Sequence, residues 1–186
     1  PMLLTRLGGS HRSKEFTAFF ADTLDRLIKY LGTKQRVYVA TSSATGLMEA
    51  AIRNGVKKRV VNFACGAFSK LWHDIALACG VEADLVEVEW GKGLPGELVE
   101  KHLATGKYDA MTYVHNETST GVMNPLAEMM EAAKRHPDVM VAVDCVSSMG
   151  GVRVDVDGLG IDMILAGTQK AFGIPPGLAV CVVSDR

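Results

Sequence analysis

Apolar residues near the start of the chain recur at helical spacing. From Phe16 to Leu31 they repeat every three to four positions, as one face of an amphipathic helix requires. Ser13 suits the N-cap position before this pattern, and Gly32 suits the position where a helix ends. The pattern therefore predicts a helix over residues 14–31, with Phe16 and Phe20 stacked one turn apart.

After this helix, short apolar runs alternate with helical patterns. The predicted strands cover residues 36–40, 59–63, 84–88, 110–115, 139–143, 163–166 and 178–183, and the predicted helices cover 45–54, 67–79, 96–104 and 126–135. Strands separated by such helices favour a mainly parallel sheet that is covered on both faces. The predicted fold is therefore α/β, a three-layer αβα sandwich. In such sheets ligands bind beyond the carboxyl ends of the strands, so functional residues are expected there.

Composition and charge exclude several classes of protein. The apolar share of 48% and the charged share of 22% are typical of a globular domain. With 20 basic against 21 acidic residues, the chain lacks the charge excess expected for nucleic-acid or membrane binding, and no apolar run of about 18 residues predicts a membrane span. The four cysteines lie far apart in apolar surroundings, which favours a reduced, cytoplasmic setting and predicts no metal site.

The first predicted strand ends in a run of hydroxyl and small residues, from Thr41 to Gly46. This run leads directly into a predicted helix. Unpaired N–H groups at the start of a helix attract anions, so a phosphate would bind well there. The alternative is that Ser43 or Thr45 only caps the helix.

Two later strands end in an acid and an amine. Asp144 follows the apolar strand 139–143, and a buried carboxylate costs several kcal/mol unless a partner such as a protonated ring nitrogen meets it. The alternative is that Asp144 caps the following turn. Lys170 follows the strand 163–166 and precedes Ala171 and Phe172. This setting predicts a partly buried amine that acts as a nucleophile, whereas most lysines are solvated surface residues.

An anion site, an acid and an amine are the three partners that pyridoxal-5'-phosphate (PLP) needs for its phosphate, ring nitrogen and aldehyde. Over nearly its whole length the chain resembles the class V aminotransferase family of fold type I PLP enzymes, above all its serine–pyruvate and alanine–glyoxylate aminotransferase branch. The matching phrases are HRSKEF (11–16), SSATGLMEAA (42–51), ETSTGVMNPL (117–126), VDCVSSMGG (143–151) and GIDMILAGTQKAFGIPPGLA (160–179).

The resemblance implies a role for each matching residue. Lys170 would be the catalytic lysine that forms the Schiff base and shuttles a proton, and Asp144 would be the catalytic acid beneath the ring nitrogen. The further cofactor-binding residues that it implies are Ser43, Ala44, Thr45 and Gln169 around the phosphate, Phe68 and Val146 on the two ring faces, and Ser119 near the phenolic oxygen. Val146 is expected to point to the same side as Asp144 along an extended segment.

Several positions have a second interpretation or depart from the family. Phe68 is alternatively an ordinary core residue, and Trp72, one turn later, is expected in the core. Asn116 stands where related sequences commonly have glycine, so its role is open. The role of His11 is open as well.

The resemblance also implies an activity and an assembly. It predicts a homodimeric aminotransferase that moves an amino group from a small amino acid, alanine or serine, to a 2-oxo acid, glyoxylate or pyruvate. The alternatives are other fold type I chemistry, as in a desulfurase or a lyase, and a non-catalytic PLP-binding fragment. Desulfurases typically carry histidine where this chain has Gln169, which argues against them.

The ends of the chain suggest that it is a piece of a longer protein. It begins at Pro1 and ends at Arg186, soon after Lys170. Relatives continue into a smaller C-terminal domain, which supplies an arginine for the substrate carboxylate. We therefore expect residues 1–186 to form the large, PLP-binding domain without that smaller domain.

Overall fold

The computed structural model describes residues 10–186, and the chain divides after Lys34 into two compact units. The described part of the first unit is mainly helix α1 (Lys14–Leu31). Ser13 Oγ accepts the Phe16 N–H at 3.1 Å, and Gly32 ends the helix in the left-handed conformation at φ 66°. The rings of Phe16 and Phe20 stack with their centroids 6.3 Å apart. The predicted bounds of this helix are confirmed.

The second unit is built on a seven-stranded sheet with the order β1-β9-β8-β7-β4-β2-β3. Its strands are β1 (Arg36–Ala40), β2 (Arg59–Ala64), β3 (Glu82–Glu87), β4 (Ala110–Val114), β7 (Met140–Asp144), β8 (Met163–Gly167) and β9 (Ala179–Val183). Strand β9 is antiparallel to both of its neighbours, and the remaining neighbours in this sheet pair in parallel. The mainly parallel sheet that the sequence predicts is confirmed.

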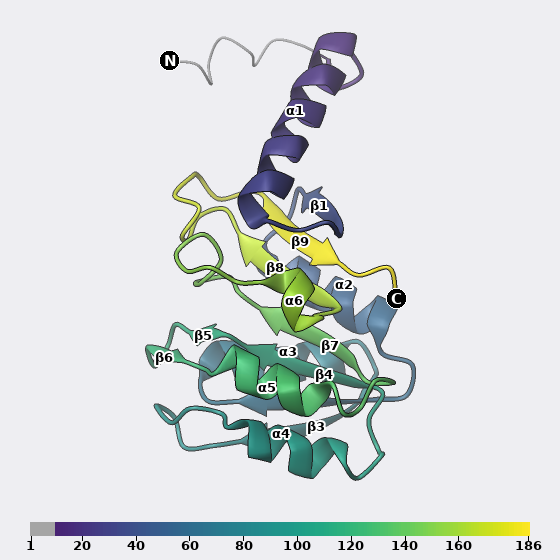
Figure 1. Ribbon diagram of the computed structural model, residues 1–186, viewed down its shortest axis with the longest axis vertical. Helices are drawn as coiled ribbons and strands as arrows, with labels where there is room; N and C mark the ends of the chain where they lie inside the picture. Colours follow the sequence, from purple (N-terminus) through teal and green to yellow (C-terminus); the bar gives the residue numbers. More distant parts are fainter. Residues whose placement is uncertain (1–9) are drawn as a thin grey trace. The chain divides into compact units, whose positions relative to one another are not determined.

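Helices cover both faces of this sheet, which confirms the three layers (Figure 1). Helices α2 (Ala44–Gly55) and α3 (Ala67–Ala78) lie on one face, and α4 (Gly96–Leu103), α5 (Leu126–Ala133) and the short α6 (Val156–Leu159) lie on the other. Side chains alternate between the faces of a strand. Val60 of β2 packs in the core beneath α2 and α3 with Trp72, whereas the ring of Phe63 meets His102 of α4 edge-on.

The sequence missed three features of this unit. A small hairpin, β5 (Asn116–Glu117) and β6 (Val122–Met123), follows β4, and α6 was not predicted. Strand β9 is reversed because it follows β8 without a helix, and a parallel return needs a crossover of about a dozen residues or more. All strands of the large sheet except β9 therefore end at the same edge, where the predicted chemistry lies.

Candidate active site

A cavity of about 110 Å³ lies at this carboxyl edge of the sheet. The residues predicted to bind the cofactor that line it are Ser43, Ala44, Thr45, Phe68, Asp144, Val146, Gln169 and Lys170. They come from the start of α2, the start of α3 and the segments that end or follow β7 and β8. The parallel direction of these strands brings residues that are distant in sequence to one cavity.

Asp144 is the buried acid of the cavity. It is the last residue of β7, is 3% exposed and accepts the Val146 N–H at 2.7 Å through Oδ1. The pKa of Asp144 is raised to about 7, mainly because the carboxyl group is buried. Within this net shift, the hydrogen bond from the Val146 N–H lowers the pKa, and the charge of Glu117 raises it. The indole N–H of the buried Trp72 also lowers it, although it reaches no hydrogen-bond geometry with any described residue. The charge of Lys170 lowers the pKa of Asp144 slightly. Asp144 therefore holds the turn, and no lysine, arginine or histidine of residues 10–186 is hydrogen-bonded to its carboxyl group.

Val146 lines the cavity as predicted, but the predicted reason is wrong. Residues 146–148 form a turn instead of an extended segment. The Asp144 carboxylate accepts the Val146 N–H, and this short-range bond favours a turn over continued strand. The turn, and not strand alternation, brings Val146 to the same cavity as Asp144.

Lys170 also lines the cavity, but the expected partial burial is wrong. Lys170 is exposed, and so are its neighbours Gln169 and Ala171 in the loop after β8. The base of this loop is fixed at Thr168, whose hydroxyl donates to the Pro175 carbonyl at 2.8 Å. The amine is thus held at the cavity edge by the loop and is accessible to a ligand.

The start of α2 forms the third part of the cavity. Ser43 occupies the N-cap position, as one of the two sequence interpretations expected. Its side chain forms no capping hydrogen bond within the described part of the chain. Ala44 and Thr45 follow it in the cavity wall. The hydroxyls and the first N–H groups of the helix are therefore suited to an anion.

The two aromatic residues of α3, Phe68 and Trp72, lie in different environments. Phe68, in the first turn of α3, is 41% exposed and lines the cavity, so it is not a core residue. Trp72 is 0% exposed and belongs to the core, as predicted. Phe68 offers a ring face to a planar ligand.

The β5–β6 hairpin and the turn after β7 supply residues that the sequence interpretation placed differently or missed. Asn116, Thr118 and Ser147 line the cavity, and the hydroxyls of Thr118 and Ser147 hydrogen-bond each other. Ser119 is not among the lining residues; its hydroxyl donates to Glu117 at 2.7 Å and accepts the Ala67 N–H at 2.9 Å. Strand β5 covers only Asn116 and Glu117, and residues 118–120 form a turn. Strand alternation therefore separates Asn116 from Glu117, but it does not place Thr118 or Ser119.

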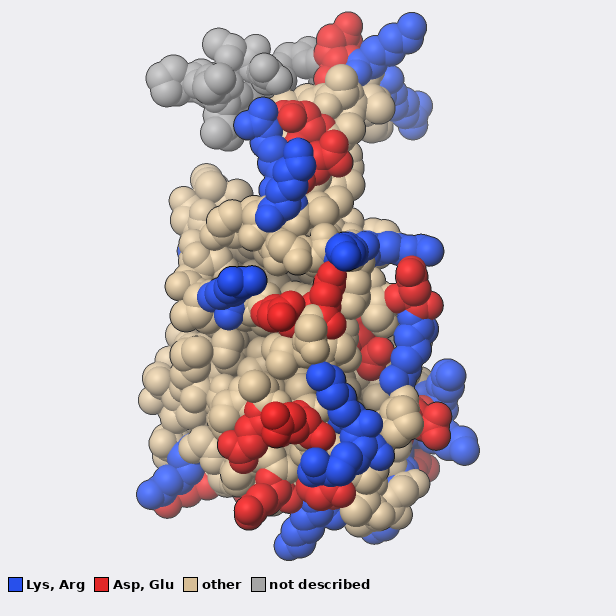
Figure 2. All heavy atoms as spheres, viewed as in Figure 1, with Lys and Arg blue, Asp and Glu red and all other residues tan. Residues whose placement is uncertain are grey.

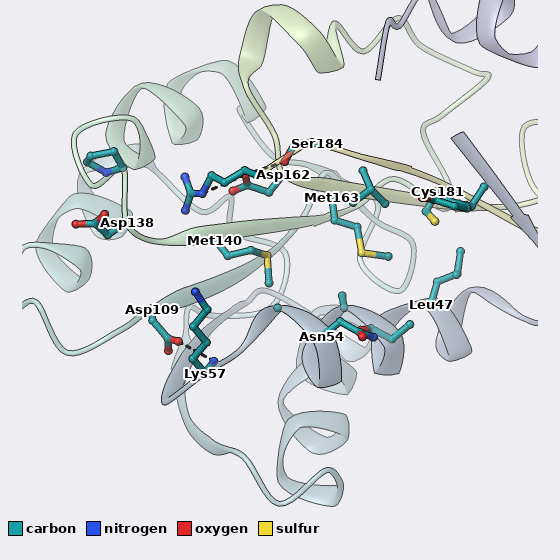
Figure 3. Close-up of a pocket in the computed structure, with 17 residues that line it drawn as sticks. Leu47, Asn54, Lys57, Asp109, Asp138, Met140, Asp162, Met163, Cys181 and Ser184 are labelled. Atoms are coloured by element: carbon teal, nitrogen blue, oxygen red, sulfur yellow. Dashed lines mark hydrogen bonds and ion pairs between the residues drawn. The ribbon is translucent and has the colours of Figure 1, made fainter. Parts of the chain in front are cut away.

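A larger hollow of about 750 Å³ lies at the opposite edge of the sheet (Figure 3). Met140 and Met163, at the starts of β7 and β8, line it together with residues of α2. None of the residues predicted to bind the cofactor is among its lining residues. Asp109 there accepts the Lys57 N–H at 2.7 Å. We assign the chemistry to the smaller cavity, because ligands of open α/β sheets bind at the carboxyl edge.

Surface charge agrees with the balanced composition. Figure 2 shows acidic and basic side chains interspersed on the visible face of the molecule, without a broad area of one sign. Among the helices that the structure describes, none has the length and apolar character needed to cross a bilayer.

Comparison with known proteins decides the family. The model of the family "Aminotransferase class-V" matches residues 4–186. The chain belongs to the class V aminotransferase family. This agrees with the resemblance carried by its motifs and with its fold.

Class V relatives match the chain along almost all of its length. An uncharacterized aminotransferase of Methanocaldococcus jannaschii is 40% identical over 95% of this chain and 46% of its own length. A serine–glyoxylate aminotransferase of Hyphomicrobium methylovorum is 35% identical over 94% of this chain and 45% of its own length. The crystal structure of an alanine–glyoxylate aminotransferase from Nostoc sp. has a TM-score of 0.90 and 27% identity, and covers all of this chain and 50% of its own. The chain spans about half the length of the curated relatives it matches.

Proposed function

We propose that the chain is the PLP-binding part of an aminotransferase that moves an amino group from a small amino acid, alanine or serine, to a 2-oxo acid, glyoxylate or pyruvate. The observation that carries the proposal is the meeting of Lys170, Asp144 and the start of α2 in one cavity. These are an amine, a buried acid and an anion site. PLP carries an aldehyde, a ring nitrogen and a phosphate that match them.

The chemistry of the cavity fits this cofactor. A carboxylate that is 3% exposed is costly to ionise, and a protonated ring nitrogen would offset that cost. The Ser43 hydroxyl is free of a capping bond within the described chain, and with the N–H groups of Ala44 and Thr45 it suits a phosphate. The exposed Lys170 amine can reach an aldehyde and condense with it, with loss of water.

The remaining cavity residues would hold and orient the cofactor. Phe68 and Val146 would cover the ring, and Gln169 would add a donor for the phosphate. Ser119 stays a predicted cofactor contact through the resemblance alone, because its hydroxyl binds Glu117 and the Ala67 N–H. When bound, PLP supplies an electron sink for the negative charge that develops at the substrate Cα. Lys170 would move the proton at that carbon, and Asp144 would hold the proton of the ring nitrogen.

The names of two relatives support glyoxylate as the 2-oxo acid and a small amino acid as the amino donor. Two of the three proteins described above are named for serine–glyoxylate and alanine–glyoxylate transfer. We also propose that residues 1–186 form the large domain of a longer protein, which acts as a homodimer in the cytoplasm. The free cysteines among the described residues support a reduced setting.

The test is an absorbance titration of the chain with PLP. The covalent link to Lys170 should give a band at about 400 to 430 nm. Lys170→Ala should lack this band, whereas Lys101→Ala, which removes an exposed lysine on α4, should retain it. Reduction with borohydride followed by peptide mass mapping should place the adduct on Lys170. A wild-type chain without the band, or a Lys170→Ala chain that keeps it, contradicts the proposal.

A further inference from the structure

Glu117 is a fully buried carboxylate that lies just outside the cavity. It is 0% exposed, and its two neighbours in the hairpin, Asn116 and Thr118, line the cavity. Transfer of an ionised carboxylate from water to the protein interior costs several kcal/mol of free energy. Glu117 therefore needs hydrogen-bond donors that offset this cost. Because Glu117 lies between two residues of the cavity wall, its hydrogen bonds tie that wall to the residues that donate them.

The hydrogen bonds that Glu117 accepts come from neutral donors. Oε2 accepts both the N–H and the hydroxyl of Ser69 at 2.7 Å. Oε1 accepts the Phe68 N–H at 3.3 Å, the Ser119 N–H at 3.1 Å and the Ser119 hydroxyl at 2.7 Å. Burial raises the pKa of Glu117, but these donors together outweigh it, so the pKa lies below its ordinary value. Glu117 is therefore ionised at neutral pH.

This carboxylate caps helix α3 from a distant part of the chain. The N-cap residue of α3 is Gly66, which has no side chain to accept the first N–H groups. Glu117 accepts the N–H groups of Phe68 and Ser69, and its charge suits the positive end of the helix. A Cβ atom at position 66 would lie 2.5 Å from Glu117 Cγ. Glycine is needed at position 66 for this close approach.

The cap joins two walls of the cavity. Phe68, one of the residues whose N–H is held, lines the cavity from α3, and Asn116 and Thr118 line it from the hairpin. The charge of Glu117 also acts on Asp144 and raises its pKa, after the larger effect of burial. A positively charged group bound at Asp144 would therefore be attracted by two carboxylates, those of Asp144 and Glu117.

We propose that Glu117 is a positioning residue of the cofactor site: its buried carboxylate holds the first turn of α3, and with it Phe68, to the hairpin that lines the same cavity. This inference rests on the function proposed above. Glu117 does not line the cavity and acts through Phe68, Asn116 and Thr118. The sequence motif ETSTG contains Glu117, but the role of this residue follows from its contacts with α3.

The decisive variant is Glu117→Gln, because an amide keeps the size of the side chain but replaces one accepting oxygen with a donor. The matched control is Glu128→Gln. Glu128 accepts the Gly96 N–H at 2.8 Å at the start of α4, away from the cavity, so it loses a cap of the same kind. Three quantities are measured on the full chain: amide hydrogen exchange without PLP, the dissociation constant of PLP, and the pH midpoint of the band at about 400 to 430 nm.

In Glu117→Gln, exchange at the Phe68 and Ser69 amides should become about tenfold faster, and PLP should bind about tenfold more weakly. The pH midpoint of the band should move to lower pH, because a negative charge that favours the protonated form is lost. Glu128→Gln should change exchange only at the start of α4. Equal dissociation constants and midpoints in the two variants overturn the proposal.

Failure of the proposed function and failure of Glu117→Gln to fold can each be distinguished from failure of this inference. If the wild-type chain itself forms no band, the proposed function fails first, and that failure is recognised before any variant is compared. If Glu117→Gln does not fold, Ser69→Ala removes the hydroxyl that donates to Glu117 and accepts the Cys65 N–H. It leaves the charge of Glu117 and the hydrogen bond from the Ser69 N–H in place. A twofold to threefold weaker binding of PLP to Ser69→Ala supports the proposal, and unchanged binding overturns it.

Discussion

Replacing Asp144 with asparagine should change how the stability of the ligand-free chain depends on pH. The pKa of Asp144 rises from 3.8 to about 7 in the folded chain because the carboxyl is buried. A raised pKa means that the folded state binds the proton more tightly than the unfolded state does. Protonated Asp144 therefore contributes to the free energy of unfolding. This contribution is complete below pH 3.8 and is lost as the pH rises to about 7.

The size of the effect follows from the shift. Each pKa unit corresponds to about 1.4 kcal/mol, so ionisation of Asp144 should lower the free energy of unfolding by on the order of 4 kcal/mol. Domains are typically stable by about 5 to 15 kcal/mol, so the loss is a large share. Asparagine does not ionise, but its Oδ1 can still accept the Val146 N–H.

The assay is urea unfolding of the wild-type chain and Asp144→Asn at a series of pH values from about 4 to 8. The stability of the variant relative to wild type should increase from about pH 4 to about pH 7 and level off above that. Asp138→Asn, which changes an exposed aspartate, is the control and should not show this trend. A difference between wild type and Asp144→Asn that stays constant with pH would refute the argument from burial.

Two further variants test other parts of the structure. Phe68→Ala removes a ring that lines the cavity and should weaken PLP binding about tenfold in a titration, a loss of about 1 to 1.5 kcal/mol, whereas Phe68→Trp should bind well; equal binding by Phe68→Ala would speak against a contact with the ring. Asp109→Ala removes the acceptor of the N–H groups of Lys57, Lys58 and Arg59, at 2.7, 3.0 and 2.8 Å, and should lower the free energy of unfolding by about 2 to 3 kcal/mol in urea. A change below about 0.5 kcal/mol would show that water replaces Asp109 as the acceptor.

Local patterns predicted most of the elements and the three strand ends that carry chemistry. The apolar runs before Asp144 and Lys170 identify strands, and strands joined by helices run parallel, so their carboxyl ends meet at one edge. The meeting of Ser43, Asp144 and Lys170 in one cavity follows from these two facts. Only the family resemblance added Phe68 and Val146, which line the same cavity, as expected contacts of the cofactor ring.

Errors arose where a side chain depends on a loop. Burial of Lys170 was inferred from its apolar neighbours, but both Lys170 and Ala171 are exposed in the loop after β8. Val146 was expected on an extended segment, yet a bond from its N–H to Asp144 favours a turn. Sequence neighbours do not determine the direction of a loop, because turns are fixed by hydrogen bonds whose partners differ from case to case.

By itself, the sequence determined the fold class and the edge of the sheet at which Ser43, Asp144 and Lys170 meet, because periodicity and strand direction are local properties. Only the tertiary structure decided what Glu117 does. Its carboxylate meets the Ser69 N–H across 48 residues of sequence, and it replaces a cap that Gly66 lacks. No local pattern encodes such a contact, because it exists only once the β5–β6 hairpin and helix α3 have packed together.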